Sequence, residues 1–104
     1  MLEEVYEILD LIESSILEID SEKGSSSILE DIGYMTEKRR KELNLRNDAY
    51  EALQEIKKYF NNQRTLSSEK TDQLMSVIDK FFVENNQSLF VINTILPFRL
   101  EYLP

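Results

Sequence analysis

The apolar residues between positions 49 and 82 recur at helical spacing on both sides of a short polar turn. They stand three or four residues apart before the turn and again after it: Ala49, Leu53, Ile56 and Phe60, then Leu74, Ile78 and Phe81. This spacing places each set along one side of an α-helix with 3.6 residues per turn. The turn, residues 61–68, ends in Ser67-Ser68, a pair that can cap the following helix. The stretch is therefore predicted to be a helical hairpin, and the chain built around it is predicted to be all-α.

Few residues elsewhere in the chain would interrupt a helix. The 104 residues include two glycines, Gly24 and Gly33, and two prolines, Pro97 and Pro104, so no proline precedes position 97. Proline is the strongest helix breaker, because it lacks a backbone N–H and its ring clashes with the preceding turn. Apolar residues also recur three and four positions apart over residues 2–20, opposite an acidic face, and predict the first helix there.

A single domain is expected, with helices over about residues 2–20, 28–43, 48–61 and 68–84. Ser27 and Glu30 have the spacing of a capping box and start the second helix. A break near residues 44–47 is preferred, because four similar helices make a compact bundle. Neither glycine nor proline enforces that break, so one long helix over residues 28–61 is the alternative. The predicted architecture is an antiparallel four-helix bundle with a short apolar C-terminal tail packed on it.

The predicted tail, residues 89–104, carries ten apolar residues among its sixteen. Exposing such a tail to water is costly, so we expect it either to pack on the bundle or to contact a partner. Its β-branched and aromatic content suits a short strand or a turn across the bundle. In the alternative it is a recognition segment, because aromatic residues and arginine are frequent interface hot spots. The candidate anchors are Phe90, Phe98, Arg99 and Tyr102.

Charge is distributed unevenly along the chain, whose formal net charge is −8. Residues 1–37 hold eleven acidic residues and one basic residue, whereas residues 38–64 hold eight basic residues and four acidic ones. A protein with this net charge is repelled by nucleic-acid phosphates and by anionic lipid, so no nucleic-acid partner is predicted. Any anion contact is expected at a run of four basic residues: Lys38, Arg39, Arg40 and Lys41.

Three interpretations of the basic run are open. Its side chains can form a solvated helix face, with Glu37 and Glu42 as ion-pair partners. They can also dock on the acidic face of the first helix, or make electrostatic contact with an acidic partner or with anionic headgroups. Four consecutive helical residues point around the whole helix, so not all four can join one patch.

The residue types that the sequence lacks narrow its chemistry. Without cysteine there is no disulfide and no thiolate ligand, and without histidine the commonest general acid–base group is missing. Carboxylate pairs such as Glu3 and Glu7 lie on a solvated face, whereas general acid catalysis needs a carboxyl group whose pKa is raised by burial. We therefore predict no catalytic residue, no metal and no cofactor, and the chain is not expected to be an enzyme.

No membrane insertion is predicted for the chain. It has no apolar run of about 18 residues, the length that a transmembrane helix needs. The start, Met1-Leu2-Glu3-Glu4, also lacks the basic and apolar regions of a signal peptide. A cytoplasmic protein without a transmembrane segment is the expectation.

The layout of these features resembles one family. The features are an acidic first helix, a serine-rich loop at 21–27, the arm at 49–56, the turn at 62–66, and the helix at 74–82 with an apolar tail after it. Together they are similar to the small immunity proteins that protect Gram-positive bacteria from their own pediocin-like (class IIa) bacteriocins. The resemblance implies an antiparallel four-helix bundle without catalysis. It also implies recognition of a sugar-transporter membrane receptor engaged by the bacteriocin, with the C-terminal half setting specificity.

Two functions are compatible with the sequence. In the first, the chain is a cytoplasmic immunity protein that binds the peptide-engaged membrane receptor. In the second, it is a small helical regulatory, inhibitor or assembly-subunit protein of a phage or mobile element, acting by protein–protein binding as a monomer or homodimer. The predicted partner-binding residues are Lys38, Arg39, Arg40, Lys41, Phe90, Phe98, Arg99 and Tyr102.

Overall fold

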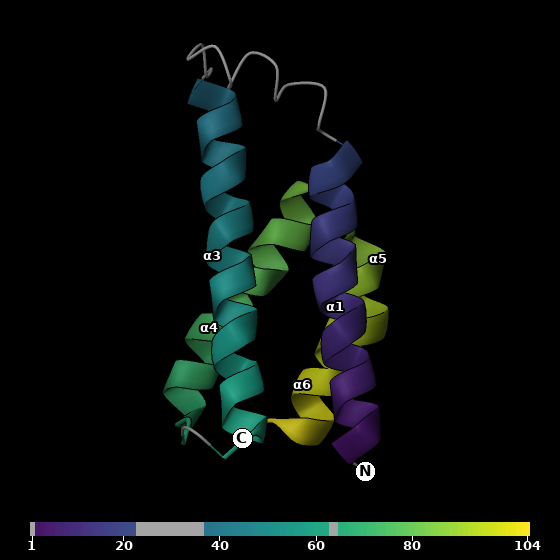
Figure 1. Ribbon diagram of the computed structural model, residues 1–104, viewed down its shortest axis with the longest axis vertical. Helices are drawn as coiled ribbons and strands as arrows, with labels where there is room; N and C mark the ends of the chain where they lie inside the picture. The colour runs from purple at the N-terminus through teal and green to yellow at the C-terminus, as the bar shows by residue number, and fades with distance from the viewer. Residues whose placement is uncertain (1, 23–36, 63–64) are drawn as a thin grey trace.

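The computed structural model describes residues 2–22, 37–62 and 65–104, and all regular structure in these ranges is helical (Figure 1). The elements in chain order are α1 (Leu2–Glu22), α3 (Glu37–Phe60), α4 (Ser68–Glu84), α5 (Ser88–Phe90), the π-helical turn η2 (Val91–Ile95) and α6 (Leu96–Tyr102). The described ranges contain no strand, which confirms the all-α class. Residues 28–36 of the predicted second helix, and the capping box at 27–30, lie outside the described residues.

The helices α1 and α4 lie where their apolar spacing predicts them. The structure places α1 at Leu2–Glu22, two residues longer than expected, and α4 at Ser68–Glu84. At the start of α4 the Ser67 hydroxyl accepts a hydrogen bond of 3.1 Å from the Lys70 N–H. This cap satisfies one of the backbone donors that the first turn of a helix leaves without an intrahelical partner.

The predicted break near residues 44–47 is wrong, because α3 runs without interruption from Glu37 to Phe60. Asn44 and Asn47 are exposed on the solvent side of α3. Their preference for caps and turns is therefore too weak to end the helix there. Leu45 and the fully buried Ala49 keep the apolar face continuous across the expected break. The alternative of one long helix is therefore correct over the described residues 37–60.

The core lies where α1, α3, α4 and the C-terminal elements meet. α1 and α3 lie side by side and run in opposite directions, and α4 packs along α3 (Figure 1). The chain then turns back, so that η2 contacts α4 and α6 contacts α1. The buried apolar side chains are Val5, Leu9, Ile12, Ile16, Ala49, Ala52, Leu53, Ile56, Leu66, Leu74, Met75, Ile78, Phe81, Phe82, Ile95 and Phe98.

The expectation of a strand or turn for the tail is also wrong, because α5, η2 and α6 form a helical path, here called the C-terminal segment (Ser88–Tyr102). Within it the Leu96 N–H bonds to the Val91 carbonyl, five residues back, which defines the π turn. The next residue, Pro97, has no N–H, and its ring disfavours a regular helix interior. The wider turn directly before the proline lets the chain remain helical. Packing of the buried Ile95 and Phe98 outweighs the strand preference of the β-branched residues.

Candidate functional site

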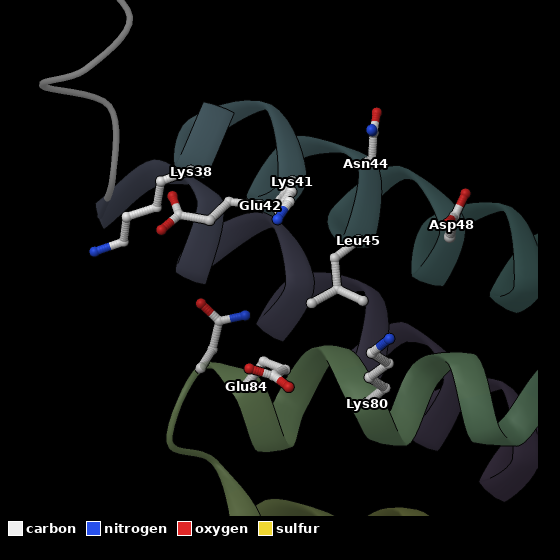
Figure 2. A pocket seen from close by; sticks show the side chains of 9 residues that line it. Lys38, Lys41, Glu42, Asn44, Leu45, Asp48, Lys80 and Glu84 are labelled. Carbon is white, nitrogen blue, oxygen red and sulfur yellow. The ribbon is translucent and has the colours of Figure 1, made fainter. Parts of the chain in front are cut away.

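A groove of about 530 Å³ lies between the N-terminal half of α3 and the C-terminal end of α4 (Figure 2). Its lining consists of Lys38, Lys41, Glu42, Asn44, Leu45, Asp48, Lys80, Glu84 and Asn85. In Figure 2, Leu45 points from α3 toward Lys80 on α4, while Asn44 and Asp48 point away from α4. The groove therefore has one aliphatic side chain at its centre and charges of both signs around it.

This composition differs from that of a small-molecule site. Cofactor and substrate pockets are mostly apolar and bring a few polar groups together on one ligand. Here three lysines and three carboxylates line the groove. In Figure 2 no two of the carboxylates point toward the same position. A polar rim around an apolar centre is instead typical of a surface that binds another protein.

The predicted basic run is divided between this groove and its surroundings. Lys38 and Lys41 line the groove, and Lys41 also pairs with Glu37 at 3.8 Å on the exposed side of α3. Arg39 is buried and pairs with Glu42 at 3.5 Å, whereas Arg40 is exposed. Two of the four residues therefore share one surface, as expected when consecutive side chains point around a helix.

The aromatic residues predicted as tail anchors point into the fold. Phe98 is 1% exposed, and its ring packs 6.0 Å from that of Phe60 and 5.5 Å from that of Tyr102. Phe90 is half-buried, with its ring centroid 4.6 Å from that of Phe82. The Tyr102 hydroxyl donates a hydrogen bond of 3.1 Å to the Glu4 carboxylate on α1. In this structure these side chains hold the C-terminal segment against the core.

Arg99 fastens the C-terminal segment to α4. Its guanidinium forms an ion pair with Asp72 and lies 3.7 Å from the Asp79 carboxylate. Burial raises the pKa of Asp79, and the charge of Arg99 only partly opposes that effect. Because Phe60 and Lys38 stand at opposite ends of α3, about 33 Å apart along its axis, the structure places Phe98, which packs on Phe60, far from the basic run. Phe90 instead packs on Phe82, near the end of α4 that lines the groove.

The acidic face of α1 is contacted by a basic residue that sequence reasoning did not single out. Lys57 on α3 bonds to Glu13 and lies 3.5 Å from Asp10, and Gln54 donates a 3.1 Å hydrogen bond to Glu13. The Lys57 hydrogen bond is the main cause that lowers the pKa of Glu13. Burial acts to lower the pKa of Lys57, but the bonds to Glu13 and Asp10 outweigh it and raise that pKa. Lys57 thus joins α3 to α1. From sequence alone, this contact with the acidic face of α1 was one interpretation of the basic run instead.

Sequence reasoning also missed a second surface, on the solvent side of the C-terminal segment. Four aliphatic side chains line it, here called the outer stripe: Leu89 (72% exposed), Ile92 (56%), Leu96 (43%) and Leu100 (77%). Their spacing of three, four and four residues is a helical signal. The apolar content of the tail was recognised, but the strand expectation hid this spacing.

Comparisons of the chain with protein-family models, with curated proteins and with solved structures found no match. Over the described residues, no helix has the length and apolar character required to cross a membrane. The same residues contain no cluster of three or more carboxylates placed to hold a metal ion.

Proposed function

We propose that this chain is a non-catalytic, cytoplasmic immunity protein that protects its cell from a bacteriocin by binding the peptide-engaged membrane receptor. In this proposal its helices form the antiparallel four-helix bundle of the family that the sequence resembles. The groove between α3 and α4 is the surface that contacts the receptor. The single observation that supports protein binding is the composition of this groove, an aliphatic centre at Leu45 within a rim of both charges.

The arrangement of the rim suits a protein partner better than a small anion. Lys41 and Lys80 lie close to Glu42 and Glu84 around the same groove, so an isolated anion would meet carboxylates as well as ammonium groups. A protein surface can match both signs at once, and charge complementarity of this kind selects partners and sets their orientation. The basic run predicted to bind a partner contributes Lys38 and Lys41 to this rim.

The test is affinity capture from solubilised membranes of Gram-positive cells, with and without an added pediocin-like peptide. The proposal predicts that a sugar-transporter membrane subunit is recovered only when the peptide is present. Recovery of a soluble protein independently of the peptide would contradict it and favour a helical regulator, inhibitor or assembly subunit.

A matched pair of charge reversals locates the contact. Lys41→Glu changes the groove, while Lys58→Glu changes an exposed lysine near the other end of α3. We expect Lys41→Glu to reduce peptide-dependent recovery about tenfold or more, because a like charge facing the partner is unfavourable by more than 1 kcal/mol. Lys58→Glu should leave recovery unchanged. An equal loss in both variants would mean that net charge, rather than the groove, governs binding.

A further inference from the structure

The C-terminal segment is apolar on both of its faces. Its inner face places Ile95 and Phe98 in the core, and its solvent side carries the outer stripe. Among the described residues the outer stripe is exposed to solvent, which makes it a candidate contact surface for another molecule.

The charges of the C-terminal segment favour a second copy of the chain as that molecule. Its only charged residues are Arg99, which is paired with α4, and the exposed Glu101. The outer stripe itself carries no charge, so pairing two copies desolvates no ion. A lipid surface fits less well, because the chain has a net charge of −8 and anionic lipids repel it.

We propose that the protein is a homodimer in which the outer stripes of two copies pack antiparallel about a twofold axis. In this register Leu89 faces Leu100 of the partner subunit, and Ile92 faces Leu96 of the partner subunit. All four residues are exposed on the solvent side of the segment, so the same residues can meet when one copy is turned end for end. The two Glu101 carboxylates then lie at opposite ends of the interface. A parallel arrangement would bring them together.

The size of the outer stripe matches what one protomer of a dimer contributes. Its four side chains expose roughly 500 Å², near the upper range of apolar patches on monomeric proteins. An interface of standard size buries about 800 Å² on each partner, of which nearly two thirds is apolar in homodimers. Leu11 on α1 is also exposed, and it lies on the same side of α1 as Glu4, which bonds to Tyr102.

This inference goes beyond the proposed receptor contact and does not depend on it. The groove between α3 and α4 shares no residue with the outer stripe. Self-association of the purified protein can therefore fail while peptide-dependent capture succeeds, and the reverse can also occur.

Cysteine cross-linking tests the register, because the chain contains no cysteine of its own. We expect Leu89→Cys mixed with Leu100→Cys to form disulfide-linked dimers under mild oxidation several-fold faster than either variant alone. Leu17→Cys, an exposed position on α1, is the control and should cross-link slowly with both. Self-linking of Leu100→Cys as fast as the mixture would overturn the antiparallel register.

Sedimentation equilibrium of the full chain tests the dimer itself. Leu96→Ser and Leu17→Ser form a matched pair, because both leucines are 43% exposed and neither change alters charge. We expect Leu96→Ser to weaken self-association about a hundredfold, because twofold symmetry removes a side chain worth about tenfold from each copy. Leu17→Ser should leave it unchanged, and circular dichroism should show equal helix content in both. A wild-type protein that stays monomeric at about 100 μM, or equal weakening by both variants, would overturn the proposal.

Discussion

The inner and outer faces of the C-terminal segment use similar apolar residues in opposite environments. Phe98 on the inner face is fully packed against α3, whereas Leu100, two residues later, is almost wholly in water. Arg99 between them bonds to two carboxylates of α4. The difference shows that apolar content alone does not say whether a residue stabilises the fold or offers a contact. The face it occupies decides this, and the two faces therefore make different predictions.

The largest expected effect comes from truncating the inner face. Phe98→Ala should lower the free energy of unfolding by about 3–5 kcal/mol, because it removes a buried ring and leaves a cavity. Leu100→Ala should change it by less than about 0.5 kcal/mol under monomeric conditions, because its side chain is already hydrated. Urea denaturation at low protein concentration measures both. An equal loss in the free energy of unfolding in both variants would contradict the assignment of Phe98 to the core and of Leu100 to the solvent side.

A smaller effect is expected when the polar anchor of the inner face is removed. Arg99→Gln should cost about 1–2 kcal/mol at neutral pH, because it leaves the half-buried Asp79 carboxylate without its cation. Adding Asp79→Asn should recover most of that loss, because a neutral amide has a lower desolvation cost. Thermal melts of wild type, the two single variants and the double variant give the stabilities for a double-mutant cycle. Additive losses would show that Asp79 and Arg99 are not coupled.

The pH dependence of the Arg99→Gln loss follows from the raised pKa of Asp79. A carboxyl group whose folded pKa is raised favours the folded state below its unfolded pKa, and that contribution is lost as pH rises through the folded pKa. Removing Arg99 raises the folded pKa of Asp79 further. The difference between wild type and Arg99→Gln should therefore be largest at neutral pH and shrink as the pH falls toward 4. A difference independent of pH would exclude Asp79 as its cause.

The smallest effect is expected at the contact between α1 and α3, which serves as a reference. Glu13→Gln should cost about 0.5–1 kcal/mol, because Lys57 and Glu13 are only partly shielded from water. Here the pKa of the carboxyl group is lowered, so its contribution is present above the unfolded value of 4.5 and is lost as pH falls through the folded pKa. The raised pKa of Lys57 adds a contribution that is lost only at alkaline pH. Melting curves between neutral and acid pH should show that the stability difference between wild type and Glu13→Gln disappears in acid. A difference that persists in acid would contradict the role given to the ionised Glu13.

Local periodicity predicted α1 and α4 well, because each has one apolar face and a regular 3.6-residue repeat. It failed at residues 44–47, where polar residues that could cap a helix face solvent in the middle of α3. It failed again in the C-terminal segment, where η2 adds a residue to one turn. Phe90 and Phe98 are eight residues apart, so in a straight α-helix their side chains would point in directions that differ by roughly 80°. With the wider turn between them, both face the core.

The candidate surfaces were predicted only in part for the same reason. Helix geometry predicted that the four basic residues would not share one patch, but which of them line the groove, Lys38 and Lys41, depends on how α3 packs against α4. Phe98, Arg99 and Tyr102 were chosen by residue type, whereas their contacts within the fold follow from the helical form of the segment. That form depends on tertiary contacts with α1 and α4, which a single sequence does not display.

The central claim is that the outer stripe is a contact surface for a second copy of the chain. The most direct measurement is the melting temperature of the wild-type protein as a function of its concentration. For a dimer that unfolds to separate chains, Tm should rise by about 3 °C for each tenfold increase in concentration, and the rise should vanish in Leu100→Ser. A Tm that does not change with concentration in the wild type, or the same rise in Leu100→Ser, would contradict the claim.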